Sequence, residues 1–219
     1  MNKYKCLMLD HDDTAVSSSR EIHYPAFIKT VETLRPRMSV PSLEAFMQAC
    51  FYPGLFDYYT KVLEFTPEEF ELETDMWQRY VRDHVPHFFD GLGEILKKFK
   101  AGGGIIAVSS QSHRDVIVRD YRTRLGFLPD YVYGFDIGKE KSKPSPFAVF
   151  DVCNLCGIAP DEVLVVDDLK PGYDMAKGAG VDFAAAGWAY DIPEIEGFMR
   201  ENCDFYLKTV DDLRNLLFS

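Results

Sequence analysis

The chain has 219 residues, of which 47% are hydrophobic and 14% aromatic, so it can bury a core and is too apolar to be disordered. Its formal net charge of −11 argues against binding to nucleic acid or to an anionic membrane surface. The sequence has no apolar run long enough to span a bilayer and no signal-peptide core, so we expect a cytoplasmic protein.

The first element is an apolar run, Cys6–Leu9, that ends in the acidic segment 10–14. The run has the continuous apolar character of a strand buried on both faces of a parallel sheet, where ligands bind beyond the carboxyl ends of the strands. Three carboxylates within four residues repel one another unless a cation or a proton relieves them. The segment predicts a site in which Asp10 attacks or binds a metal, Asp12 handles protons and Thr14 fixes the turn. An acidic, solvated turn is the alternative.

Helical patterns fill the chain from about Ile22 to His87. They predict four amphipathic helices, the last of which begins at Thr66-Pro67-Glu68-Glu69, where the residue types form an N-cap, a Pro in the first turn and a capping box. Four helices in this length are enough for a small bundle. We therefore expect an all-helical domain, residues 17–87, inserted after the first strand.

Helices and strands alternate from Phe88 onward, which indicates βαβ units. The fold class is therefore α/β, with a three-layer, Rossmann-like parallel-sheet core formed by residues 1–16 and 88–219. The expected strands are 105–108, 131–135, 163–166, 183–186 and 205–207, and the expected helices are 92–99, 112–126, 147–156, 172–179 and a short one opened by Thr209.

The cysteines do not indicate a disulfide framework, because five is an odd number in a chain of this size. Cys153 and Cys156 have the spacing of a redox or zinc motif. They lie in a predicted buried helix without a second Cys or His pair, so we interpret them as small apolar residues of a packed helix.

Three further polar features follow strands or precede a helix on the same predicted edge of the sheet. They are Ser109 with Ser110, Lys143 in a basic segment, and the pair Asp167-Asp168. Singly, they could be a helix cap, a solvated lysine and a polar turn. Together, two acidic clusters can bind Mg²⁺, and a lysine with a hydroxyl can hold a phosphoryl group. The combination suits phosphoryl transfer.

In order and strand context, these motifs resemble those of the haloacid dehalogenase-like hydrolases, in the branch that includes phosphoglycolate phosphatases and β-phosphoglucomutases. The resemblance covers nearly the whole chain and implies that the helical insertion is a cap domain. It implies catalytic roles for Asp10 as nucleophile, Asp12 as acid/base, Ser109 as phosphoryl-binding hydroxyl and Lys143 as cation. It implies a Mg²⁺ site formed by Asp10, Asp12, Asp167 and Asp168.

Two positions depart from the family pattern. Many members have Gly-Asp in the fourth motif and another acid four residues later, whereas this chain has Asp167-Asp168 followed by Gly172. An Asn commonly follows the hydroxyl of the second motif, whereas this chain has Ser110 and Gln111.

The function implied is a Mg²⁺-dependent phosphatase that acts on a small phosphorylated metabolite through an aspartyl-phosphate, as a monomer or weak homo-oligomer. A sugar-phosphate mutase and a non-catalytic phosphate-binding or signalling member are the alternatives.

His23 lies near the position of a mutase cap histidine but one residue out of register, so a surface or hydrogen-bonded histidine is favoured. Asp12 and Asp168 argue against a dehalogenase, and no motif marks a Schiff-base lysine for a phosphonate hydrolase. The sequence does not indicate which polar residues of the expected cap select the substrate. The candidates are Arg35, Arg37, Lys61, His84 and His87.

Overall fold

The computed structural model of the protein describes residues 3–219. The chain divides into two compact units, one formed by residues up to Ser17 together with His87–Ser219 and the other by Ser18–Pro86. Within the described residues, no helix combines the length and apolar character needed to cross a membrane.

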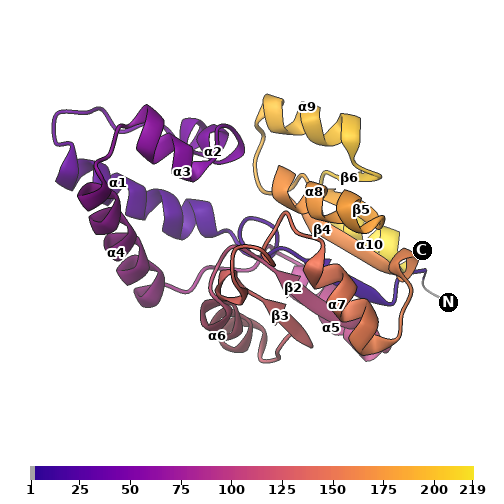
Figure 1. Cartoon of the computed structure of the whole chain (residues 1–219). Coiled ribbons are helices and arrows are strands. Elements are labelled where there is room, and N and C mark those ends of the chain that lie inside the picture. The colour runs from indigo at the N-terminus through magenta and orange to yellow at the C-terminus, as the bar shows by residue number, and fades with distance from the viewer. Residues whose placement is uncertain (1–2) are drawn as a thin grey trace. The chain divides into compact units, whose positions relative to one another are not determined.

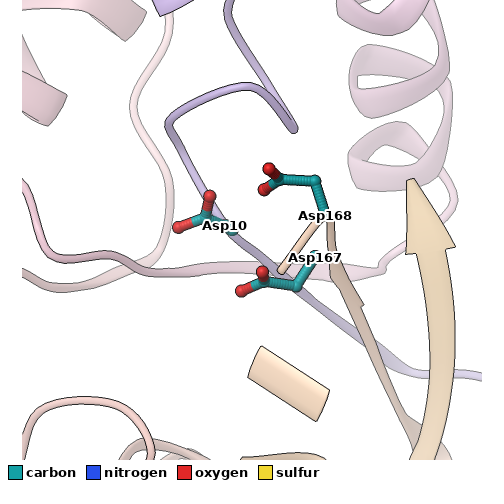
Figure 2. A group of neighbouring side chains, drawn as sticks. All are labelled: Asp10, Asp167 and Asp168. Carbon is teal, nitrogen blue, oxygen red and sulfur yellow. The ribbon is translucent and has the colours of Figure 1, made fainter. Parts of the chain in front are cut away.

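The first unit is built on a six-stranded sheet with the order β3-β2-β1-β4-β5-β6, in which every neighbouring pair is parallel (Figure 1). β1 is central because its apolar residues can be buried on both faces. Its pairing with β4 places Asp10 near Asp167 and Asp168 at the carboxyl ends of the two strands (Figure 2). The strands are β1 (Cys6–Leu9), β2 (Ile105–Ser109), β3 (Tyr131–Tyr133), β4 (Val163–Asp167), β5 (Asp182–Ala186) and β6 (Phe205–Leu207).

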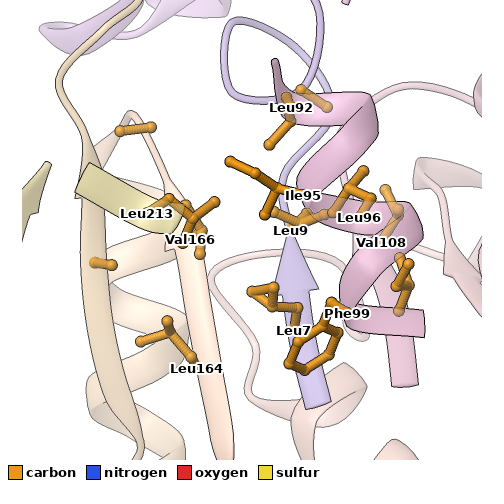
Figure 3. Packing of buried hydrophobic residues seen from close by; sticks show 14 of the residues in the cluster. Leu7, Leu9, Leu92, Ile95, Leu96, Phe99, Val108, Leu164, Val166 and Leu213 are labelled. Carbon is orange, nitrogen blue, oxygen red and sulfur yellow. The ribbon is translucent and has the colours of Figure 1, made fainter. Parts of the chain in front are cut away.

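Helices cover both faces of this sheet, which confirms the predicted α/β, Rossmann-like architecture. On one face, Leu7 and Leu9 of β1 pack with apolar residues of α5 and α10 (Figure 3). Side chains alternate along a strand, so Cys6 and Met8 point to the opposite face, and they are also fully buried. Burial of each large apolar side chain contributes about 2 kcal/mol before conformational entropy is counted. The helices are α5 (Leu92–Ala101), α6 (Arg114–Leu125), α7 (Phe147–Cys156), α8 (Lys170–Ala179), α9 (Pro193–Asn202) and α10 (Val210–Phe218).

The described residues of the second unit form only helices and loops. Aromatic rings supply its core, with Phe27 lying 4.9 Å from Phe46 and 6.0 Å from Tyr59 between ring centroids. Thr66 and Glu69 form the predicted capping box at the start of α4. The helical elements are a π-helical turn η1 (Ser19–His23), α1 (Tyr24–Leu34), α2 (Leu43–Phe51), α3 (Leu55–Asp57), a second π-helical turn η2 (Tyr58–Val62) and α4 (Pro67–Asp83).

Two elements differ from the sequence-based expectation. The predicted strand 131–135 ends at Tyr133, and Phe135–Ile137 form a 3₁₀ turn instead. A Cβ at Gly134 would lie 2.5 Å from the backbone nitrogen of Arg114, so the chain passes close to α6 at this glycine and leaves the sheet. Helix α9 was not predicted, because its buried side chains are few and charged residues surround them.

Candidate active site

Three buried carboxyl groups meet at the carboxyl ends of β1 and β4. The backbone N–H of Asp10 donates a hydrogen bond to the carbonyl oxygen of Val166 over 2.9 Å, which continues the strand pairing up to the site. Asp10, Asp167 and Asp168 are buried, and each offers a carboxylate oxygen within 4.8 Å of the others. Figure 2 shows that the three groups extend toward the same side. The local fold thus concentrates negative charge where a parallel sheet places its ligands.

Lys143 supplies a buried positive charge to this group. Its Nζ lies 2.6 Å from Oδ1 of Asp10 and 2.6 Å from Oδ2 of Asp167. Burial alone would lower the pKa of the ammonium, but the two carboxylates more than compensate and raise it above its usual range. Lys143 therefore stays charged, and the structure brings it to the acids as the sequence predicted.

The acids are not fully neutralised by this lysine. Burial raises the pKa of Asp10 to about 7; Lys143 opposes this shift, and repulsion from Asp167 adds to it. The pKa of Asp168 is also raised well above its usual range, by burial and then by repulsion from Asp167. Three carboxylates face one ammonium, so a divalent cation would balance the remaining charge. Oxygen ligands are those that Mg²⁺ prefers, so Asp10, Asp167 and Asp168 fit a magnesium site.

Asp12 lies outside this three-carboxylate group. Its Oδ2 accepts hydrogen bonds from the hydroxyl of Ser110 over 3.2 Å and from that of Ser112 over 2.7 Å. Both serines follow β2. Ser110 comes directly after Ser109, which matches the hydroxyl of the second motif, and the side chain of Ser110 holds Asp12. The two hydroxyls hold the carboxyl group of Asp12 in place, while its predicted roles as acid/base and as a metal ligand stay predictions.

Ser109 is the last residue of β2 and is buried at the same edge of the sheet. Its hydroxyl points to the sulfur of Met175 on α8 at 3.6 Å, which is a weak hydrogen bond. Its predicted contact with a phosphoryl group stays a prediction.

The turn after Asp10 is held by its own backbone and by a side chain. The carbonyl oxygen of His11 accepts hydrogen bonds from the N–H groups of Ala15 and Val16, both over 3.0 Å. The hydroxyl of Thr14 donates to Oδ1 of Asp168 over 3.0 Å, so Thr14 fixes the turn as expected and links it to the second acidic segment. Asp13 has a φ of +57°, a left-handed conformation that Asp tolerates better than most residues.

Several residues near the site were missed by sequence reasoning. Ser112 holds Asp12, and the imidazole Nε2 of His11 lies 3.1 Å from Oδ2 of the buried Asp120 on α6. After β5, the hydroxyl of Tyr190 donates to Oδ2 of Asp168 over 2.5 Å. The signal for Tyr190 was its position after a predicted strand, at the same edge of the sheet as the acids.

Gly172 has a structural reason to lack a side chain. A Cβ at this position in α8 would lie 2.1 Å from Cγ and Oδ2 of Asp167. The carboxyl group of Asp167 therefore occupies the volume that a larger residue at position 172 would need. In this chain, Asp167 therefore requires a glycine at position 172.

In the second unit, candidate substrate-selecting residues have partners within the unit. Arg35 is paired with Glu69, and Lys61 donates to Asp57 over 2.7 Å. The Nδ1 atom of His23 accepts a hydrogen bond from the indole N–H of Trp77 over 2.9 Å, which agrees with a hydrogen-bonded histidine.

Comparisons with known proteins agree with the fold and the motifs. The family model for haloacid dehalogenase-like hydrolases matches residues 8–186, so the chain belongs to this family of enzymes. The chain is 25% identical to a phosphoglycolate phosphatase of Thiobacillus denitrificans over 197 residues, which cover 85% of each protein. It is 24% identical to another from Pseudomonas savastanoi pv. phaseolicola, over 97% of this chain and 78% of the relative. A putative haloacid dehalogenase-like hydrolase from Bacteroides fragilis has a similar fold, with a TM-score of 0.80 and 19% identity over 96% of this chain and 100% of that one.

Proposed function

We propose that this chain is a Mg²⁺-dependent phosphatase that hydrolyses a small phosphorylated metabolite through an aspartyl-phosphate on Asp10. The observation that carries this proposal is the buried group of Asp10, Asp167 and Asp168 with Lys143 against two of its members. Such a group can receive a phosphate dianion only if a cation compensates the charge. The phosphoglycolate phosphatases among the relatives support phosphate-ester hydrolysis as the reaction.

In the first step, a carboxylate oxygen of Asp10 forms a bond to phosphorus, and the bond between phosphorus and the leaving oxygen breaks. Asp12, oriented by the hydroxyls of Ser110 and Ser112, donates a proton to the leaving oxygen. Lys143 and the hydroxyl of Ser109 hold the phosphoryl oxygens. A Mg²⁺ ion held by Asp10, Asp167 and Asp168 would supply positive charge that lowers the repulsion between the nucleophile and the phosphate.

In the second step, water attacks phosphorus and gives a proton to Asp12, which is then a carboxylate. The bond between phosphorus and Asp10 breaks, inorganic phosphate leaves, and the carboxylate of Asp10 is restored. We assign the helical unit as the cap domain that excludes bulk water and selects the leaving group.

The test is phosphate release from a panel of sugar phosphates, phosphoglycolate and nucleotides, with Mg²⁺ and with EDTA. The wild type is compared with Asp10→Asn and with Asp161→Asn, which makes the same change at an exposed position outside the site. We expect release that requires Mg²⁺, that is lost in Asp10→Asn and that is unchanged in Asp161→Asn.

The same experiment separates the alternatives. A persistent aspartyl-phosphate without release of phosphate indicates a mutase or a signalling member. Retained release in Asp10→Asn contradicts the assignment of the nucleophile.

A further inference from the structure

The loop that follows β5, residues 187–192, is fixed against the loops that carry the acids. The backbone N–H of Gly187 donates to the carbonyl oxygen of Leu207 over 2.8 Å, which ties the start of the loop to β6. The indole N–H of Trp188 donates to the carbonyl oxygen of Thr14 over 3.1 Å. A Cβ at Gly187 would lie 2.5 Å from the ring of Tyr206, so the loop passes close over that ring. These contacts determine where Tyr190 lies.

Asp168 receives two hydroxyl groups, one on each carboxylate oxygen. Thr14 donates to Oδ1 over 3.0 Å from the loop after β1, and Tyr190 donates to Oδ2 over 2.5 Å from the loop after β5. Asp168 is buried, so the two bonds define the rotation of its carboxyl group. Each oxygen keeps a lone pair beyond the one that accepts the hydroxyl.

We propose that Tyr190 is a positioning residue for the metal site, which holds the carboxyl group of Asp168 in the orientation that binds Mg²⁺. This inference rests on the proposed function, because it takes Asp168 to be a metal ligand. Groups that hydrogen-bond to a metal-ligating carboxylate orient it and support metal affinity.

The distribution of charge around the site supports this role. The ammonium of Lys143 contacts Asp10 and Asp167, whereas the two described hydrogen-bond donors to Asp168 are neutral hydroxyls. A neutral donor orients a carboxylate without adding a positive charge that repels a cation. Asp168 therefore combines a fixed orientation with described side-chain partners that carry no positive charge, which leaves its oxygens open to a divalent cation.

The test is the affinity for Mg²⁺, measured by isothermal titration calorimetry on wild type and Tyr190→Phe. The Phe variant removes the hydroxyl and retains the ring. Tyr206→Phe is the matched control, because Tyr206 lines the same pocket as Tyr190. Asp168→Asn serves as the reference for loss of a ligand.

We expect Tyr190→Phe to weaken Mg²⁺ binding roughly 10-fold to 100-fold and Tyr206→Phe to leave it unchanged. The phosphatase assay gives a second readout: the Mg²⁺ concentration for half-maximal activity rises in Tyr190→Phe, while kcat at saturating Mg²⁺ stays near the wild-type value. A purely structural role for Tyr190 would lower the melting temperature without this shift.

The outcomes separate this inference from the proposed function. If the wild type binds Mg²⁺ and Asp168→Asn does not, equal affinity or tighter binding in Tyr190→Phe overturns the role of Tyr190 alone. If the wild type does not bind Mg²⁺, or if Asp168→Asn binds it equally well, the proposed metal site itself fails. If Tyr190→Phe does not fold, Thr14→Val tests the hydroxyl on the other oxygen of Asp168, and unchanged Mg²⁺ affinity there overturns the positioning of this carboxylate by its hydroxyl partners.

Discussion

The carboxyl group of Asp167 lies directly against Gly172, in the first turn of the helix that follows β4. A Cβ at Gly172 would come within 2.1 Å of the Asp167 side chain. An approach this close is possible only where the neighbouring residue has no side chain. Asp167 also accepts a hydrogen bond from the backbone N–H of Leu169 over 2.9 Å and one from Lys143, so it cannot move without disturbing the site.

We therefore expect Gly172→Ala to displace Asp167 and weaken Mg²⁺ binding at least 10-fold, with a loss of about 1–3 kcal/mol of unfolding free energy from overpacking. Calorimetric titration and urea unfolding measure the two effects. Gly197→Ala is the control, because a Cβ at this position in α9 has no neighbour within 4 Å. Normal Mg²⁺ affinity in Gly172→Ala would show that the contact does not constrain the site.

Replacement of Lys143 by Met should destabilise the metal-free protein. The substitution leaves Asp10 and Asp167 buried without their cation, and the loss of one partner of a buried ion pair costs about 3–5 kcal/mol. Urea unfolding in EDTA measures this loss, and added Mg²⁺ should restore part of it. Lys139→Met, at an exposed lysine, should leave stability unchanged. Equal stability of the wild type and Lys143→Met in EDTA would contradict the ion-pair assignment.

The stability of the metal-free protein should fall as the pH rises through about 7. Burial raises the pKa of Asp10 to about 7 from 3.8, so in this range the folded chain holds a proton that the unfolded chain has lost. The contribution of Asp10 is thus fully present below pH 3.8 and is lost as the pH passes about 7. We expect the melting temperature in EDTA to fall less steeply with pH in Asp10→Asn than in the wild type. Identical slopes would contradict the shift.

The buried pair of His11 and Asp120 should stabilise the turn after β1. Its two atoms lie 3.1 Å apart, and both side chains are 1% exposed. Asp120→Ala leaves the imidazole without this partner, and we expect a loss of about 3 kcal/mol in urea unfolding. The double variant His11→Leu with Asp120→Leu should lose less than the sum of the single variants, because apolar groups replace both partners. Additive losses would show that the two residues are independent.

The sequence alone is sufficient to predict the central strands of the sheet. β1 and β4 are buried on both faces, so their residues form continuous apolar runs that mark them as strands of a parallel sheet. Helix α9 buries only Ile195 and Met199, and its other residues are exposed or half-exposed, so few apolar residues mark the segment as a helix. The strand at Tyr131 was predicted two residues too long, because the close approach of Gly134 to α6 is a tertiary contact.

For the site, residues that directly follow strands were predicted, and residues whose contacts depend on the paths of loops were not. Asp10, Asp167 and Asp168 come together because parallel strands end at one edge. Tyr190 lies after a predicted strand at this edge, but its contact with Asp168 depends on the path of the loop that Trp188 bonds to Thr14, which the sequence does not reveal. Ser112 reaches Asp12 through the turn after β2 for the same reason.

The central place of β1 also has a consequence for biosynthesis. Cys6 of β1 is aligned with Ile105 on one side and with Val163 on the other. The ribosome therefore synthesises β1 well before the two strands with which it pairs. At about 5–20 residues per second, a ribosome takes roughly 10 to 30 s to supply both partners. During that time the apolar strand has no sheet to enter, and pairing over such sequence separations is slow. We therefore expect β1 to stay unpaired until the second half of the sheet has emerged, and the acidic site to form only at that late stage.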